Sequence, residues 1–307
     1  MMNKSGYILS VPNFSEGRRK DVIEKVVKPL KDAKSVKLIS YEPEEEFNRT
    51  VVTVIGEPVP LKKALLAMAE KSYILINMEE QQGAHPRIGS QDTIPIYPFH
   101  NTTLEECRIL AEEIGEEIYQ TFDVPVYFSG VNARNDQRKA LAYIRKGQYE
   151  GLKKMVHTDE RSPDIGSPRL HPTAGATIVS ADIEWITAYN VFLATENIDI
   201  AKKIAKTVRG PSGGFQSVRA VGLHFPERPG VVVSMNLLDC KKTPLYRVFN
   251  LIQNEAKRYG VAITDSELVG PIRMSYLLDS VQYFLGLEGF RTEQILESHL
   301  MEGETNF

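Results

Sequence analysis

The sequence predicts an α+β protein, an α/β sandwich of two subdomains that each follow the ferredoxin-like order βαββαβ. Three observations lead to this fold class. The 307 residues leave room for two domains, at roughly 150 residues each. Strand and helix patterns follow one another as β-α-β-β-α-β along the second half of the chain, which is the ferredoxin-like order. The first half repeats this order less regularly, so we expect subdomains over residues 1–179 and 180–307.

The elements of the first half are predicted from short apolar runs and from apolar stripes with helical spacing. Runs of apolar and β-branched residues bounded by turn residues predict five strands: residues 7–11, 36–41, 50–55, 93–97 and 124–128. One stripe predicts the first helix: Val22, Ile23, Val26, Val27 and Leu30. A second helix is expected over residues 61–72. A third is expected to begin after Thr103, because Thr103 and Glu106 have the spacing of a capping box.

The second half has the clearer pattern. The strand signals occur there at four places: residues 185–193, 218–225, 231–236 and 261–268. A helix is expected over residues 197–209, where Asn197 can cap the first turn. Another helix is expected from Leu245 up to Gly260. A last helix is predicted over residues 277–301 with four apolar residues as its packing stripe: Leu277, Val281, Phe284 and Leu285.

Charge and composition exclude several classes of function. The 37 Lys and Arg residues nearly balance the 40 Asp and Glu residues, for a net charge of −3, which argues against a nucleic-acid or anionic-membrane partner. No apolar run approaches the roughly 20 residues of a membrane span, and the N-terminus lacks a signal peptide. Two cysteines and the absence of metal-ligand spacings such as HExxH predict no metal site. We expect a cytoplasmic protein that binds small molecules.

Two loops are candidates for the functional site, because they contain histidine and arginine residues among prolines and glycines. Residues 161–175 hold three prolines and two glycines, which excludes a helix or a central strand. A loop of this length in a compact protein is usually functional or disordered, and its apolar residues Ile165 and Leu170 favour an ordered one. For His171 within it, a functional and a structural role are equally compatible with the sequence.

The second loop surrounds His85. An imidazole placed near Arg87 and Asp92 can act as a general base near neutral pH, while the arginine binds a carboxylate. The alternative is a surface histidine that hydrogen-bonds only within its own loop. Asn13 to Gly17 form a strand-to-helix turn that could bind an anion, or in which Ser15 simply caps the helix. Arg49 at a strand end can also bind an acid.

Four strings, in this order, resemble the formiminotransferase family, the glutamate formimidoyltransferases: VPNFSEGR at 11–18, NRTVVTVIG at 48–56, GAHPRIGSQDTIPIYP at 83–98 and HPTAGAT at 171–177. The resemblance covers nearly the whole chain. It implies transfer of a formimino group from N-formimino-L-glutamate to N5 of tetrahydrofolate, in histidine degradation and one-carbon metabolism. It also implies a ligand tunnel between the two subdomains, a homodimer, and tetrahydrofolate as co-substrate without a metal. A chain of 307 residues has no room for the cyclodeaminase domain that some members carry.

The resemblance also assigns residues. The catalytic histidine of the family corresponds to His85, and Asp92 is our candidate for orienting it. The family's folate-binding segment corresponds to ten residues of the Pro/Gly loop: Gly166, Ser167, Pro168, Arg169, Leu170, His171, Pro172, Thr173, Ala174 and Gly175. For the carboxylates of the donor we predict Asn13, Arg49 and Arg87.

The sequence departs from the family beside the catalytic histidine. Ala84 replaces the family's glutamate, and residues 90–94 read Ser-Gln-Asp-Thr-Ile where the family usually has Ala-Leu-Asp-Val-Cys. The donor therefore stays open at this stage between formiminoglutamate, another formimino compound such as formiminoglycine, and a formyl group. A folate-binding module without catalysis is the alternative from a different class.

Overall fold

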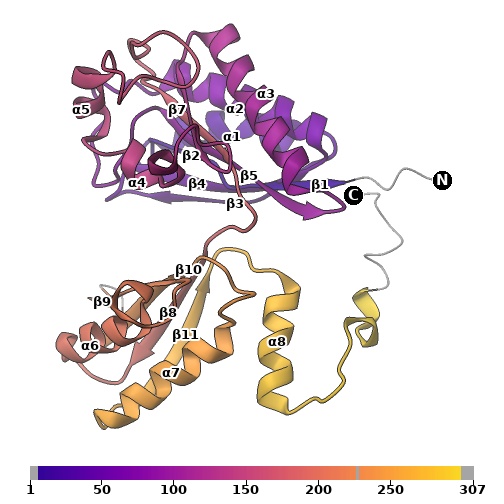
Figure 1. Ribbon diagram of the computed structural model, residues 1–307, viewed down its shortest axis with the longest axis vertical. Helices are drawn as coiled ribbons and strands as arrows, with labels where there is room; N and C mark the ends of the chain where they lie inside the picture. The colour runs from indigo at the N-terminus through magenta and orange to yellow at the C-terminus, as the bar shows by residue number, and fades with distance from the viewer. Residues whose placement is uncertain (1–5, 226–227, 299–307) are drawn as a thin grey trace. The chain divides into compact units, whose positions relative to one another are not determined.

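The computed structural model describes residues 6–225 and 228–298, and Figure 1 shows its ribbon. The chain divides into two compact units between Ile183 and Glu184, each with its own sheet. The mixed α+β class predicted from the sequence is confirmed. The predicted boundary at 179/180 falls inside a strand, Thr177–Ala181, that pairs with a neighbouring strand on each side in the first sheet. This strand therefore belongs to the first unit.

The first sheet has a ferredoxin-like half and a parallel extension. Its strands are β1 (Tyr7–Ser10), β2 (Asn13–Phe14), β3 (Val36–Glu44), β4 (Arg49–Gly56), β5 (Gln91–His100), β6 (Val126–Gly130) and β7 (Thr177–Ala181). Strands β1 and β2 share one position between β4 and β5, and β3 pairs with the other side of β4, all antiparallel. Beyond β5, strands β7 and β6 continue the sheet in parallel. Strand β7 was not predicted; its five residues begin two positions after the last residue of the Pro/Gly loop, Gly175.

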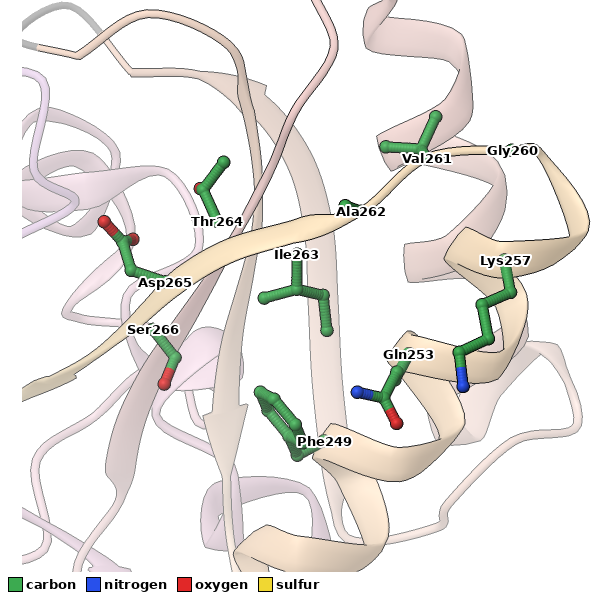
Figure 2. A pocket seen from close by; sticks show the side chains of 10 residues that line it. All are labelled: Phe249, Gln253, Lys257, Gly260, Val261, Ala262, Ile263, Thr264, Asp265 and Ser266. Atoms are coloured by element: carbon green, nitrogen blue, oxygen red, sulfur yellow. The ribbon is translucent and has the colours of Figure 1, made fainter.

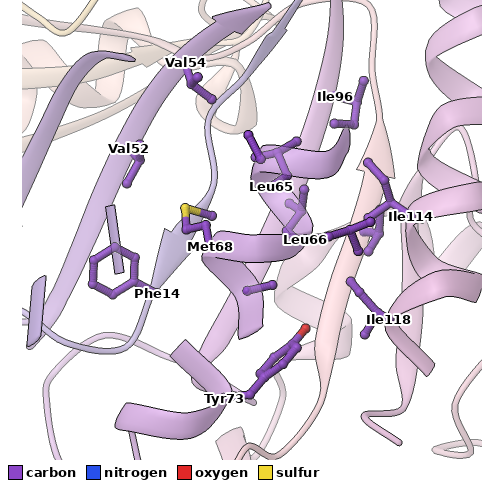
Figure 3. Packing of buried hydrophobic residues seen from close by; sticks show 14 of the residues in the cluster. Phe14, Val52, Val54, Leu65, Leu66, Met68, Tyr73, Ile96, Ile114 and Ile118 are labelled. Carbon is purple, nitrogen blue, oxygen red and sulfur yellow. The ribbon is translucent and has the colours of Figure 1, made fainter. Parts of the chain in front are cut away.

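Three helices cover one face of this sheet: α1 (Lys20–Asp32), α2 (Pro58–Leu75) and α3 (Leu104–Phe122). Figure 3 shows part of the core between them, where Phe14, Val52 and Met68 are fully buried. Each such side chain contributes roughly 1.5–3 kcal/mol on burial. The predicted capping box at the start of α3 is confirmed, with the Thr103 side chain accepting from the backbone N–H of Glu106.

A shorter segment covers the opposite face of the β5-β7-β6 part of the sheet. Its helices are α4 (Leu141–Ile144) and α5 (Gln148–Met155). Ile144 and Leu152 form a buried cluster with Ile178 of β7 and Tyr127 of β6. This segment therefore sits on the face that helices α1 to α3 leave open, and the site described below forms on that face.

The second unit has the complete ferredoxin-like order. Its elements are β8 (Thr187–Leu193), α6 (Ile198–Val208), β9 (Val218–His224), β10 (Val231–Leu237), α7 (Leu245–Arg258) and β11 (Ile263–Val269). The sheet order is β11-β8-β10-β9, and all neighbours are antiparallel. Asn197 caps α6 as predicted, accepting from the backbone N–H of Asp199.

The prediction of one helix over residues 277–301 was wrong. Helix α8 spans Met274–Leu285 and ends at Gly286, whose φ of +64° favours glycine. A 3-10 turn, Thr292–Gln294, follows, and residues 299–301 lie outside the described part of the chain. None of the described helices is long and apolar enough to cross a membrane.

Candidate active site

His85 lies in the loop between α2 and β5 and is only 6% exposed. The turn between β3 and β4 holds this loop through its backbone. The N–H groups of Ala84 and His85 donate to the carbonyl oxygens of Glu46 and Phe47, at 3.3 and 3.4 Å. The Asn48 side chain donates to the Gln82 carbonyl at 2.8 Å. The alternative of a surface histidine is therefore wrong, because His85 is buried against the turn between β3 and β4.

Burial and three arginines determine the charge of His85. Desolvation is the main cause that lowers its pKa to about 3, and the positive charges of Arg145, Arg49 and Arg87 add to it in that order. The imidazole is therefore neutral at physiological pH in the ligand-free protein. A neutral imidazole can accept a proton, so the electrostatics suit a base rather than an acid before substrates bind.

Asp92 is fully buried and bonded to neighbours other than His85. Its Oδ2 accepts from Nε and Nη2 of Arg145, at 2.9 and 2.5 Å, and its Oδ1 accepts from the backbone N–H of Ile88 at 2.6 Å. The prediction that Asp92 orients His85 thus has no direct hydrogen bond in its support within the described residues. What Asp92 holds directly is Arg145.

Arg87 is buried and uses all its hydrogen-bond donors on the protein. Nε donates to Gln81 Oε1 at 2.7 Å, and Nη2 donates to the Gln81 carbonyl at 2.9 Å. Two bonds, of 2.9 and 2.7 Å, go to the carboxylate of Glu150, and another goes to Gln148 Oε1 at 2.9 Å. Since a guanidinium has five N–H donors, Arg87 has none left for a ligand. The structure argues against its predicted role in binding the donor.

Arg49 retains free donors. Its Nε and Nη2 both donate to Glu44 Oε1, at 3.2 and 3.0 Å, and its guanidinium lies 5.5 Å from the ring centre of Phe47. Within the described ranges no hydrogen bond engages Nη1 of Arg49, nor Nη1 of Arg145. Two of the three arginines around His85 therefore present an unused pair of N–H donors.

The Pro/Gly loop packs against the loop of His85. Gly175 forms an isolated β-bridge with Gly89. On either side of it, the Ser90 N–H donates to the Ala174 carbonyl at 2.8 Å and the Ala176 N–H donates to the Ile88 carbonyl at 3.1 Å. The structure thus brings together the predicted catalytic residue's loop and the predicted folate loop, which are some 80 positions apart along the chain.

The side chains of the Pro/Gly loop have their own contacts. Arg169 forms an ion pair with Asp123 at 2.6 Å, and Ser167 Oγ lies 3.2 Å from the Tyr119 hydroxyl. His171 Nδ1 accepts from the backbone N–H of Ala174 at 3.0 Å, and burial lowers the pKa of this imidazole. The loop is therefore an ordered structure rather than a flexible linker.

In the turn at residues 13–17, the N–H groups just before α1 are bonded within the protein and are not free for an external anion. The Ser15 hydroxyl donates to the Gly89 carbonyl at 2.7 Å, so the suggestion that it caps the helix was wrong. Instead Glu16 Oε1 accepts from the backbone N–H groups of Arg18 and Arg19, at 2.8 and 2.9 Å. An internal carboxylate already occupies the place where an external anion would bind.

A cavity of about 610 Å³ lies elsewhere, between α7 and β11 of the second unit. Figure 2 shows that both apolar and polar side chains line it, with Lys257 and Asp265 as its charged groups. It contains no histidine and none of the residues predicted for the site, so we place the chemistry at His85. Among the residues that the structure describes, no cluster of His, Cys, Asp or Glu could hold a metal ion.

Three residues of the site were not predicted from the sequence: Arg145, Gln148 and Glu150. Arg145 directly follows α4, and Gln148 and Glu150 lie in α5, in a stretch whose alternating charges are typical of a solvated surface. No local signal marks them, because Arg145 meets Asp92 across 53 positions and Glu150 meets Arg87 across 63. Only the tertiary fold identifies these partners.

Fold and site together define an α+β protein with two ferredoxin-like sheets and a buried, neutral histidine among arginines. Residues 7–182 match the Formiminotransferase domain, N-terminal subdomain, and residues 188–300 match the Formiminotransferase domain. The chain belongs to the formiminotransferase family.

Its similarity to curated relatives extends over nearly its whole length. It is 37% identical to the glutamate formimidoyltransferase of Streptococcus pyogenes serotype M1, covering 95% of this chain and 97% of that protein. It is 36% identical to the glutamate formimidoyltransferase of Thermoplasma acidophilum, covering 94% and 95%. The formimidoyltransferase-cyclodeaminase of Gallus gallus is 34% identical, and the match covers 91% of this chain but 52% of that longer protein.

Proposed function

We propose that this protein is a transferase that moves the formimino group of N-formimino-L-glutamate to N5 of tetrahydrofolate. The observation that carries the proposal is the joining of His85 to the Pro/Gly loop through the bridge between Gly89 and Gly175. In a member of this family, that arrangement supports a base beside the folate. A homodimer, a cytoplasmic location and a role in histidine degradation stay predictions from the family resemblance.

The reaction needs a group that accepts a proton and then returns it. N5 attacks the formimino carbon and gives a tetrahedral intermediate, and the N5 proton must leave. His85, neutral in the free protein, accepts this proton and then donates it to the departing glutamate nitrogen. General acid–base catalysis of this kind contributes roughly 10²–10⁴ in rate.

The donor's carboxylates are proposed to bind Arg145 and Arg49. Both arginines act electrostatically on His85, and both have unused Nη1 donors in the described structure. Asp92 and Glu44 hold the other edges of the two guanidinium groups, which orients them before substrate arrives. Arg87 is left out of this role because its donors are satisfied internally.

Substrate binding would also activate the base. The positive charges around His85 contribute to its low pKa. Carboxylates bound at Arg145 and Arg49 offset these charges and raise the pKa of the imidazole towards the range where it shares a proton readily. The base thus gains strength in the complex with the anionic donor.

Turnover with a panel of donors tests the proposal. Purified protein and tetrahydrofolate are mixed with formiminoglutamate, formiminoglycine or N-formylglutamate, and the absorbance of the 5-substituted folate is followed. We expect turnover with formiminoglutamate and a loss of at least about a hundredfold in His85→Ala, with folate binding retained. Near-normal turnover in His85→Ala would remove the assigned base. Folate binding without turnover of any donor would favour the non-catalytic module.

A further inference from the structure

In the described structure, two side-chain oxygens near this site are buried without a partner, and the one on a strand, Asn13 Oδ1, can only accept a hydrogen bond. Among the described residues, five buried side-chain atoms lack a hydrogen bond, and two belong to the first unit: Asn13 Oδ1 and Ser90 Oγ. Asn13 is 9% exposed. Because buried polar groups are almost always hydrogen-bonded, such an acceptor is a place where a ligand or a water molecule can bind.

The backbone of Asn13 needs no help from this side chain. As part of β2 it pairs with Val51 and Thr93, and its carbonyl oxygen accepts from Gln91 Nε2 at 3.0 Å. The sheet therefore holds the residue in place while the side-chain amide oxygen stays unused. A purely structural asparagine would be expected to use this oxygen in a turn or cap.

Strand geometry places the Asn13 side chain on the face of the candidate active site. Phe14 packs in the core under α1 to α3, so its neighbour Asn13 points to the opposite face. Thr93, directly across from Asn13, pairs on its other side with Ile178 of β7. Ile178 packs against Ile144 on that opposite face, and Arg145 is the next residue of the chain.

Residues next to Asn13 and Thr93 in the chain also contact the candidate active site. Asp92, which precedes Thr93, holds Arg145. Ser15, two residues after Asn13, bonds to the backbone of Gly89 and Ser90 in the loop of His85. The unpartnered oxygen thus belongs to β2, which lies between β4, the strand that begins at Arg49, and β5, the strand of Asp92.

We infer that Asn13 Oδ1 accepts a hydrogen bond from the terminal N–H of the formimino group and so selects formimino over formyl donors. The inference rests on the proposed function. A formimino group carries a terminal nitrogen with N–H donors, whereas a formyl group of nearly the same shape carries an oxygen there. That oxygen has only lone pairs to offer to Oδ1, so a formyl donor leaves the acceptor buried and unpaired.

Size cannot make this distinction, because the two groups differ by about one hydrogen. A pocket built to bond a substrate N–H, in contrast, discriminates strongly against an analogue that lacks it. Asn13 of β2 supplies an acceptor for such an N–H.

The test compares two dissociation constants, measured by calorimetry on the full chain for N-formimino-L-glutamate and N-formyl-L-glutamate. We expect the wild type to prefer the formimino compound by roughly a hundredfold. Asn13→Ala should reduce this ratio to below roughly tenfold, mainly by weakening the formimino compound. Asn13→Asp, which keeps an acceptor at the same place, should retain the preference.

The ratio of the two dissociation constants distinguishes failure of this inference from unfolding of a variant and from failure of the proposed function. Partial unfolding of a variant lowers the active fraction for both ligands and leaves the ratio unchanged. Wild-type preference that persists in Asn13→Ala overturns the inference while the proposed function stands. Loss of preference in Asn13→Asp also overturns it, since an acceptor is still present. A wild type that binds neither compound overturns the proposed function and, with it, this inference.

Discussion

Arg145 donates two hydrogen bonds to a single oxygen of Asp92, from Nε at 2.9 Å and from Nη2 at 2.5 Å. The other oxygen of Asp92 accepts from the N–H of Ile88, whose carbonyl accepts from the N–H of Ala176. A continuous chain of hydrogen bonds thus runs from an arginine near His85 to the end of the Pro/Gly loop. Asp92 therefore couples the electrostatics of the base to the loop that we expect to bind folate.

Removing the charge of Arg145 should raise the pKa of His85. Arg145 is the largest of the charges that depress it, and Arg145→Gln also leaves the carboxylate of Asp92 without its cationic partner. Both changes favour the imidazolium. We expect the titration of His85, followed by NMR of its ring carbons, to move upward from about 3. Arg145→Lys keeps the charge and is the matched control; an equal shift in both variants would contradict the electrostatic account.

The buried histidine also makes stability depend on pH. In the folded protein the pKa of His85 is about 3, below its ordinary value of 6.5. Between these values the unfolded chain binds the proton more readily, so stability falls as pH decreases through this window. The wild type should lose about 1 kcal/mol more than His85→Gln between pH 6 and pH 5, measured by urea unfolding. Parallel pH profiles of the two proteins would show that His85 titrates normally.

The ferredoxin-like order of strands and helices could be predicted because each element has its own local sequence pattern. Alternating apolar runs and the capping box at Thr103 depend on neighbours in the sequence, and these elements were confirmed. Strand β7 was missed because its five residues lie between the Pro/Gly loop and the boundary of the units. The apolar stripe at 277–285 predicted a helix correctly, but the stop depends on the backbone conformation of Gly286.

Only those residues of the candidate site that lie together in one loop could be predicted from the sequence. His85 and Asp92 are close in sequence, and breakers and charged groups mark their loop. Arg87 shows the limit of such reasoning, because a buried arginine with satisfied donors and one that binds a ligand have the same sequence signal. Arg145 and Glu150 become part of the site only through contacts across the fold.

Arg87 should be a stabilising residue rather than a binding one. Its five donors satisfy Gln81, Gln148 and Glu150, so Arg87→Met leaves several of these acceptors without a donor. We expect a loss of roughly 3 kcal/mol in the free energy of unfolding. Arg108→Met, which breaks ion pairs on the exposed side of α3, should cost about 0.5 kcal/mol or less. A loss of the same small size for Arg87→Met would show that its network adds little.

Gly89 allows the two loops to approach, and a methyl group there should separate them. A Cβ at this position would lie 1.9 Å from the carbonyl oxygen of Ala176, which belongs to backbone and cannot rotate away. Gly89→Ala should therefore weaken folate binding, measured by calorimetry, and lower the unfolding midpoint. Gly151→Ala is the matched control, because a Cβ there meets no atom within 4 Å and Gly151 lies inside α5. It should stabilise the helix by about 0.5–1 kcal/mol and leave folate binding unchanged. If Gly89→Ala bound folate as tightly as Gly151→Ala does, the bridge between Gly89 and Gly175 would have no part in holding the folate loop.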